Sequence, residues 1–528
     1  MRKFFIKIGV IISAAAGLLL WFQNDARVLA GARPLGMDDS SGWTAANTHN
    51  PDVMDTLEAA NTSMLRVEIP WEMVEKSPGA FSWRFESAYG SIDLEQVFRR
   101  LQRRGIEPVA VLSGGPVYLS HLYPQQPVYR DQLLESFARF AHAAAEQFGE
   151  DVDYWQIGTV LNDPNSWGEM LFPGEKEPQA EPDPILYSEI LQTTYHAIKD
   201  QDARSSILAG DLVFSADCSL HPNQYLRMLN EQGAWYAVDI VNIRIHVLDQ
   251  APESAIIDIC ANLPSHPSGI ALADSIAVVS EQIEKLGEKT LWVQGLQFDT
   301  TLLAEHASIR STIPEVISSD LLTRASALLR AYGRADRIFW TFDPLNNTPG
   351  LLALQTYANL SSSLGGRFDD SGLLESREAF ILRFRGSGKL NMVAWYTQVG
   401  DDAQAMHING LENYDMRAFS ADSDSLKSKH GIHLPIKNDG STALMVSERP
   451  VLISGHPADI KQTITQRVEE SAAQASAGMQ TKFNHWLQAK KAKAAAKLGG
   501  WVAEQQASLL NSLQTSLEDW LRERLGIV

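Results

Sequence analysis

Two short segments of the chain carry residues suited to chemistry directly after apolar runs. Asn162 and Asp163 follow the run at residues 154–157, and Gly295 follows the run at residues 291–293. A carboxyl group at the end of a buried strand can give or take a proton, and a second one can attack as a nucleophile. Cleavage of an acetal bond uses such a pair of carboxyl groups. Asp163 carries such a carboxyl group, whereas Gly295 has no side chain.

These segments belong to a repeating pattern that covers about residues 31–360. Short apolar runs alternate with stretches of helical periodicity, such as residues 133–148 and 185–198. This alternation indicates parallel strands connected by helices. Eight strands are expected, which is the number in a closed (β/α)8 barrel. They lie near residues 34–37, 64–69, 107–112, 152–157, 206–210, 238–243, 290–293 and 337–340.

Several motifs along this barrel resemble those of clan A glycoside hydrolases, of the family 39, 5 and 42 type. Residues 66–71 read RVEIPW and residues 77–83 read SPGAFSW, which resemble the second-strand motif of the clan. Residues 154–165 read YWQIGTVLNDPN and resemble the fourth-strand signature W-x-I-x-N-E-P-N. Residues 291–300 read LWVQGLQFDT and resemble the seventh-strand signature W-x-T-E-x-G-W-D-T. The resemblance covers about residues 34–345 and implies a barrel that handles carbohydrate.

The resemblance also implies where the two catalytic carboxylates would stand. Retaining members hold an acid/base after the fourth strand and a nucleophile on the seventh, about 5–5.5 Å apart. Asp163 takes the first position in this chain, in NDP where the family has NEP. Its carboxyl is retracted by about an ångström, and such a misplacement costs on the order of 100-fold in rate. Gly295 takes the second position and cannot attack. The sequence therefore predicts a catalytically degenerate member.

Other positions of the resemblance imply contacts to sugar. Trp71 and Trp340 match tryptophans that face the cleft in the family. Asn162 is a candidate ligand for a sugar hydroxyl, and His246 is a candidate hydrogen-bonding group in the cleft. Arg66 matches the arginine that holds the nucleophile, and without that carboxylate it is expected to pair with Glu68 or another acid. For Asp163, the roles of weakened acid, sugar ligand and turn-forming residue before a proline all remain open.

Composition limits the partners of the chain. The formal net charge is -19 over 528 residues, and such a charge disfavours nucleic acid as a partner because phosphates would be repelled. No cofactor or metal is expected, because the sequence has neither CxxC spacing nor a glycine-rich phosphate loop. The two cysteines, Cys218 and Cys260, could pair in an oxidising compartment.

The two ends of the chain differ from the barrel. Residues 1–30 combine basic residues with an apolar run of about 15 residues, which predicts a signal peptide or an N-terminal anchor, and an exported protein. Residues 361–455 carry alternating strands and predict a small antiparallel β-sandwich. Residues 456–528 are rich in alanine and glutamine, with leucines at three-to-four spacing. They predict C-terminal amphipathic helices that pack on the protein, bind a protein partner or contact a membrane surface.

Three functions follow as hypotheses. The first is an exported, non-catalytic protein that binds a carbohydrate or polysaccharide. The second is an active O-glycosyl hydrolase with displaced carboxylates. The third is a scaffold that binds no sugar. The first accounts for both a retained barrel and missing carboxylates, and fold alone does not choose among them.

Overall fold

The computed structural model describes most of the chain between residues 34 and 457. The described residues are 34–39, 42–119, 127–171, 180–214, 220–245, 247–255, 271–305, 313–341, 351–365, 367–369, 379–386, 389–397, 403–409, 411, 414–420, 431–437 and 439–457. The expected signal segment at 1–30, the expected C-terminal helices and both cysteines lie outside them. Among the described helices, none is both long and apolar enough to cross a membrane.

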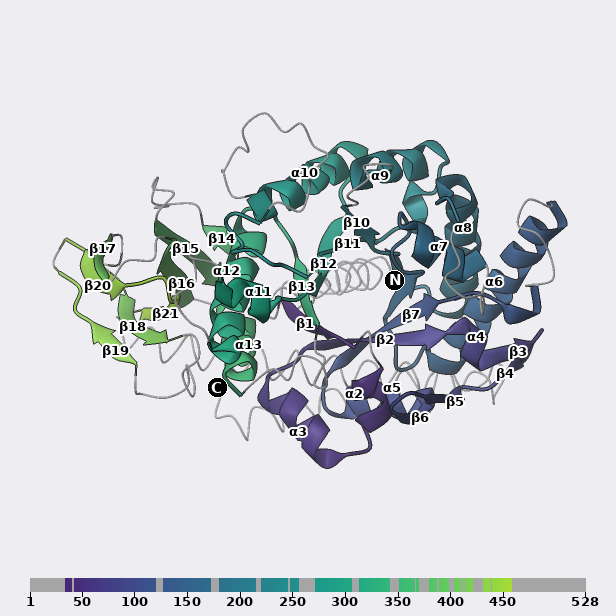
Figure 1. Cartoon of the computed structure of the whole chain (residues 1–528), viewed down its shortest axis with the longest axis horizontal. Helices are drawn as coiled ribbons and strands as arrows, with labels where there is room; N and C mark the ends of the chain where they lie inside the picture. The colour runs from purple at the N-terminus through teal and green to yellow at the C-terminus, as the bar shows by residue number, and fades with distance from the viewer. Residues whose placement is uncertain are drawn as a thin grey trace, which may run out of the picture. The chain divides into compact units, whose positions relative to one another are not determined.

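Eight parallel strands close into a barrel, as predicted (Figure 1). The barrel closes because β1 pairs with β13 on one side and β9 pairs with β11 on the other. A short strand, β10 (Leu212–Val213), extends the edge beside β11. The eight strands are β1 (Leu35–Asp38), β2 (Met64–Pro70), β7 (Glu107–Ser113), β8 (Tyr154–Ile157), β9 (Ser206–Ala209), β11 (Ile240–Arg244), β12 (Thr290–Leu296) and β13 (Arg337–Thr341).

The strands are buried on both faces, which explains their nearly continuous apolar sequence. One set of alternating side chains fills the barrel interior toward the amino ends of the strands: Met64, Val109, Leu208, Ile240, Trp292 and Phe339. Gly36 of β1 makes room for this layer, because a Cβ there would lie 2.5 Å from the Phe339 ring. The other set packs outward against the surrounding helices.

Helices surround the barrel, and several begin at recognisable caps. Asp93 accepts a hydrogen bond from the Gln96 N–H and caps α5, while Asp183 caps α8, which starts at Pro184. The helices are α2 (Trp43–Asn47), α3 (Pro51–Ala59), α4 (Trp71–Val74), α5 (Leu94–Arg103), α6 (Pro127–Phe148), α7 (Pro164–Leu171), α8 (Pro184–Gln201), α9 (Pro222–Glu231), α10 (Ala271–Leu286), α11 (Thr300–Glu305), α12 (Pro314–Ala331) and α13 (Leu351–Ser363). Between β2 and α5 the chain forms two small hairpins from β3 (Glu75–Ser77), β4 (Ala80–Phe81), β5 (Arg84–Ser87) and β6 (Gly90–Asp93).

After the barrel, the chain forms antiparallel sheets, as the sequence predicted. Six strands pair in the order β14-β15-β16-β21-β18-β19, and β17 pairs with β20. Their bounds are β14 (Arg367–Asp369), β15 (Ala379–Gly386), β16 (Lys389–Tyr396), β17 (Gln404–Ile408), β18 (Tyr414–Ser420), β19 (Ile432–Leu434), β20 (Thr442–Val446) and β21 (Val451–Pro457). The barrel and these sheets belong to one compact unit.

A buried ion pair joins the sheets to the barrel. The Arg324 guanidinium of α12 binds both carboxylate oxygens of Glu253. Trp395 of β16 donates its indole N–H to Glu253 Oε1 at 2.6 Å. Arg324 is 4% exposed and Glu253 is 12% exposed. One carboxylate therefore connects a barrel helix to the centre of the six-stranded sheet.

Candidate functional site

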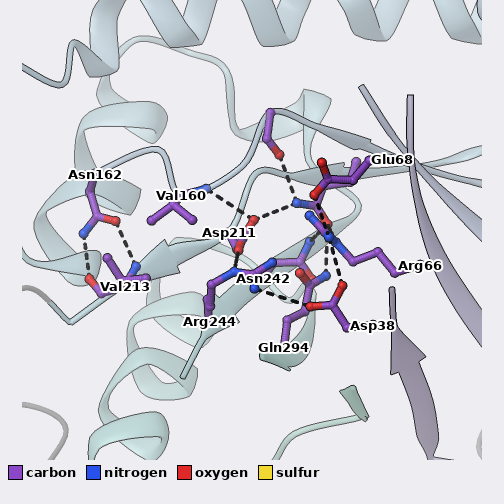
Figure 2. Close-up of polar contacts among 12 residues, drawn as sticks. Asp38, Arg66, Glu68, Val160, Asn162, Asp211, Val213, Asn242, Arg244 and Gln294 are labelled. Carbon is purple, nitrogen blue, oxygen red and sulfur yellow. Dashed lines mark hydrogen bonds and ion pairs between the residues drawn. The ribbon is translucent and has the colours of Figure 1, made fainter. Parts of the chain in front are cut away.

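Above the apolar interior, toward the carboxyl ends of the strands, the barrel is filled by polar side chains. We call this set the polar layer, and Figure 2 shows it. Its members contact each other across the barrel from strands that are not neighbours, so they lie inside it. Sites on this fold are built at this end of the barrel. The members are Asp38, Arg66, Glu68, Gln156, Asp211, Asn242, Arg244 and Gln294, all of which Figure 2 labels except Gln156.

Two arginines and three acids of the polar layer form a connected ion-pair network. Arg66 Nη1 lies 3.0 Å from Asp38 Oδ1 and 3.2 Å from Glu68 Oε1. Arg244 Nη1 lies 3.4 Å from Asp38 Oδ2, and Arg244 Nε binds Asp211 Oδ2. The side chains of Asp38, Arg66 and Asp211 are fully buried, while that of Glu68 is 33% exposed. Arg66 thus pairs with Glu68, as expected, and also with Asp38.

The pairing keeps these buried groups charged. Burial opposes the charge on Asp211, but the guanidinium groups of Arg244 and Arg66 outweigh it and hold the pKa of the carboxyl below its usual range. Burial likewise opposes the charge on Arg66, but Asp38, Glu68 and Asp211 raise its pKa above the usual value. Pairing therefore outweighs burial for Asp211 and for Arg66, and both stay charged at neutral pH.

Gln156 of β8 forms hydrogen bonds to several other members of the polar layer. Its Nε2 donates to Asp211 Oδ1 at 2.7 Å and to the Gly158 carbonyl at 2.9 Å. Its Oε1 accepts from Arg66 Nε at 3.2 Å and from Gln294 Nε2 at 3.0 Å. Since both acceptors face Nε2, the orientation of this amide is fixed. The fourth barrel strand therefore presents an amide to the interior.

The seventh barrel strand also presents an amide. Gln294 of β12 is fully buried and bonds Gln156 across the barrel. Its neighbour Gly295 has φ +73°, and a Cβ there would lie 2.8 Å from the Ile245 carbonyl oxygen and 3.0 Å from Arg244 Cγ. The pairing of β12 with β13 shifts register between Val293 and Leu296. The structure thus brings Gln294 into the polar layer, while a side chain at position 295 would meet the Ile245 carbonyl and Arg244.

The loop after β8 holds Asn162 in a structural role. The Asn162 side chain donates to the Val213 carbonyl at 2.7 Å and accepts from the Val213 N–H at 2.8 Å. It also donates to the Leu220 carbonyl, and the residue is fully buried. Each end of the amide is occupied by backbone, so the structure does not present Asn162 to a ligand.

Asp163, the expected acid/base position, caps a helix. Its Oδ1 accepts from the N–H groups of Asn165 and Ser166, both at 3.0 Å, at the start of α7. Without a gap in the fourth-strand signature, the glutamate position corresponds to Val160 instead, three residues after β8 ends. Of the roles left open by the sequence, the turn-forming one matches this geometry.

Val160 has a left-handed backbone, with φ +40°. A β-branched residue in this region is strained by about 1–3 kcal/mol. We predict that Val160→Gly raises the free energy of unfolding by about 1 kcal/mol, measured by urea denaturation. Asn61→Gly is the matched control: Asn61 has φ 55°, but asparagine tolerates this region, so a smaller gain is expected. Equal gains would contradict strain at Val160.

The tryptophans expected in the cleft lie in the core. Trp71 is fully buried, stacks on Phe140 with ring centroids 4.8 Å apart, and donates to Glu75 Oε2. Trp340 is 6% exposed and lies 5.7 Å from the Tyr357 ring of α13, on the outer side of β13. Phe339 is the neighbour that points inward. His246 lies outside the described residues.

Asp39, directly after β1, is a buried acid beside the polar layer. Burial, helped by the nearby Asp38 charge, raises its pKa to about 7, although the Thr44 and Ala45 N–H groups oppose this. The folded state therefore holds a proton here that the unfolded chain loses near pH 4. This contribution to stability is present at acid pH and is lost as the pH rises through 7.

We predict that thermal unfolding reports this titration. Between pH 6 and pH 8 the stability of the wild-type protein should fall by about 1 kcal/mol through Asp39. Asp39→Asn carries no titrating group at this position, so the fall should shrink by that amount. Differential scanning calorimetry at several pH values measures it, and an unchanged slope in the variant would contradict the assignment.

Glu72, near the mouth of the barrel, is a further acid in a largely buried environment. Burial, and then the charges of Glu68 and Glu169, raise the pKa of Glu72 above its usual value. Its Oε2 forms no hydrogen bond to a described residue, and a Cβ on Gly114 at the end of β7 would lie 2.1 Å from it. The sequence motifs did not identify Glu72, because it occupies a non-motif position next to Trp71. In the described part of the chain, no cluster of acids, histidines or cysteines is arranged to hold a metal ion.

The sequence matches no known protein family, and no curated protein matches it either. Similar solved structures include a family 39 glycoside hydrolase from Bacteroides cellulosilyticus WH2, with TM-score 0.57 and 17% identity over 80% of this chain and 81% of that one. A GH30 endoxylanase from Clostridium papyrosolvens C71 has TM-score 0.50 and 11% identity over 81% of this chain and 96% of that one. A conserved exported protein from Bacteroides fragilis has TM-score 0.51 and 12% identity over 80% and 96%. These likenesses show that the chain has the same parallel eight-stranded barrel fold as these solved structures.

Proposed function

We propose that the barrel binds a carbohydrate and does not cleave it. The observation that carries this proposal is the pair of amides on the fourth and seventh barrel strands, Gln156 and Gln294, bonded to each other at 3.0 Å. An amide can neither protonate a leaving oxygen nor attack an anomeric carbon. Retaining hydrolysis needs two carboxyl groups at this end of the barrel.

The acids that remain in the polar layer are engaged by arginines. Asp38 and Glu68 share Arg66 Nη1, so they are close enough that distance alone does not exclude a catalytic pair. Asp38 and Asp211 are fully buried and accept charge-assisted hydrogen bonds. The Asp211 carboxylate is held as a poor base, because the two guanidinium groups lower its pKa.

A neutral, hydroxyl-rich ligand suits the accessible part of this layer. Glu68 is 33% exposed and Arg244 is 17% exposed. Together they offer hydrogen-bond acceptors and donors to the hydroxyl groups of a ligand. The exported state and a protein partner for residues 456–528 belong to the same proposal, supported by the sequence patterns at the two ends of the chain.

The direct test is binding of the full mature chain to an oligosaccharide array, followed by calorimetry on the best ligand. Glu68→Gln should weaken binding by about 10-fold, because a hydrogen bond to a charged group contributes about 1.5–3 kcal/mol. Glu189→Gln is the matched control: it changes an exposed acid, paired with Arg130 on the outer helices, and should leave binding unchanged. If no sugar binds the wild-type chain, the scaffold hypothesis replaces the proposal.

The raised pKa of Glu72 beside Glu68 favours a second candidate, an O-glycosyl hydrolase with displaced carboxylates. A carboxyl group whose pKa is raised by burial is typical of a general acid. Activated aryl glycosides test this candidate. Steady turnover by the wild-type chain that falls at least 100-fold in both Glu72→Gln and Glu68→Gln would establish it and overturn the binding-only proposal.

A further inference from the structure

Three side chains of the polar layer each keep one polar atom without a hydrogen bond to any described residue. These atoms are Arg66 Nη2, Asn242 Oδ1 and Gln294 Oε1. All three residues are fully buried. An unpaired polar atom in a protein interior costs free energy. Three of them in one place therefore indicate a bound partner that the protein itself does not supply.

The three side chains converge on a single atom. Gln156 Oε1 accepts from Arg66 Nε at 3.2 Å, from Gln294 Nε2 at 3.0 Å and from Asn242 Nδ2 at 3.4 Å. In each side chain only one carbon separates the bonded atom from the unpaired one. Figure 2 draws these residues close together in the barrel interior. The side chains that carry the unpaired atoms therefore meet around one atom, Gln156 Oε1.

The chemical identity of the unpaired atoms follows from their neighbours. Gln156 Nε2 faces the Asp211 carboxylate and the Gly158 carbonyl, so Oε1 must face Gln294, and Gln294 must donate to it. Asn242 Nδ2 donates to the Ala209 carbonyl at 3.0 Å. The atoms left over are thus one N–H donor, on Arg66, and two carbonyl acceptors, on Asn242 and Gln294.

We propose that Arg66, Asn242 and Gln294 form an internal binding site for one hydroxylic oxygen. That oxygen accepts from Arg66 Nη2 and donates to the two amide oxygens. A water molecule has the two O–H groups that this arrangement uses, and buried waters typically have two to four such partners. A sugar hydroxyl offers the same oxygen chemistry with one O–H group, and this source alone rests on the proposed carbohydrate function.

High-resolution crystal structures of the full chain, without and with a bound oligosaccharide, test the site. The expected result without sugar is one ordered oxygen within hydrogen-bonding distance of at least two of the three atoms. If that oxygen remains in the complex, water is its source. If it is replaced by continuous sugar density, the ligand hydroxyl is the source. A site with no oxygen in either structure overturns the inference, whereas an oxygen in a chain that binds no sugar overturns only the proposed function.

A pair of variants gives an independent readout in solution. Gln294→Met replaces the amide with an apolar side chain of similar size, so the variant should no longer bind the oxygen. Its midpoint of thermal unfolding should fall by about 2–4 °C. Tyr225→Phe is the control. The buried Tyr225 hydroxyl also lacks a hydrogen bond to a described residue, but it lies on α9 and is not one of the three side chains that form the site. The midpoint of this variant should stay unchanged or rise. Equal changes in the two variants would count against a shared oxygen.

Discussion

Replacing Gln156 with glutamate is expected to destabilise the protein by about 3–5 kcal/mol, because it places a second buried carboxylate against Asp211. In the native structure Nε2 faces Asp211 Oδ1 at 2.7 Å and the Gly158 carbonyl at 2.9 Å. A carboxylate oxygen in its place would meet a second carboxylate and a carbonyl. The residue is fully buried, so solvent cannot screen this repulsion.

The pH dependence of this variant separates the electrostatic cause from a packing defect. Repulsion from Asp211 and burial should raise the pKa of the new carboxyl in the folded state. A group whose pKa is higher in the folded state than in the unfolded state destabilises the folded protein when it is ionised. The loss of stability should therefore shrink at acid pH and grow as the pH rises. Urea unfolding at several pH values measures this. Gln192→Glu, on an exposed glutamine of α8, should change stability by less than about 0.5 kcal/mol at each pH.

The same contacts explain why an acid is absent from the fourth strand. Asp211 and Arg244 form a buried ion pair beside Gln156, and Asp211 needs a donor from that residue. A glutamate at 156 would add a charge to a layer whose acids already outnumber its arginines. Loss of the Gln156→Glu defect when Asp211 is changed to Asn would support this coupling, since the two single effects would then not add.

The barrel could be predicted from the sequence because its signal is distributed. Eight apolar runs separated by helical periodicity each satisfy the same rule, so an error at one strand does not change the architecture. The antiparallel sheets after residue 361 were predictable from alternating strands for the same reason. The limits of these domains remain predictions.

The candidate site was harder to predict because it depends on single-residue register. The seventh-strand signature placed Gly295 at the nucleophile position, whereas Gln294 enters the barrel because it continues the alternation from Trp292. The pairing of β12 with β13 shifts register at this point, between Val293 and Leu296, and no sequence pattern records that shift. The fourth-strand loop adds a similar change, with Val160 at φ +40°.

The alternation of side chains along β13 would have predicted that Trp340 faces away from the barrel interior. Trp292 and Phe339 fill the interior toward the amino ends of the strands, so the residue after Phe339 must face outward, where Trp340 meets Tyr357. The family motif alone does not show which face of the strand this tryptophan occupies. Gln156 and Gln294, in contrast, were visible as inward positions of apolar strands, and a polar residue at such a position is the sequence signal that identifies the polar layer.

The second large effect is expected at the junction between the barrel and the sheets. Glu253→Ala should lower stability by about 3–5 kcal/mol, because it leaves the Arg324 guanidinium buried without a counter-charge. Arg324 is only 4% exposed. The change also removes the acceptor of the Trp395 N–H, which lies inside the six-stranded sheet and stacks on Phe380 at 4.8 Å. The loss should therefore act on both parts of the compact unit.

Three variants distinguish a buried charge pair from an ordinary surface contact. Glu253→Gln keeps an acceptor for Trp395 but removes the charge, so its cost should lie between wild type and Glu253→Ala. Glu284→Ala breaks an ion pair with Arg334 whose partners are 58% and 54% exposed, and such pairs contribute about 0–1 kcal/mol. Urea unfolding followed by tryptophan fluorescence measures all three. If Glu253→Ala costs no more than Glu284→Ala, the carboxylate does not hold the junction, and packing of the apolar side chains around Trp395 must do so instead.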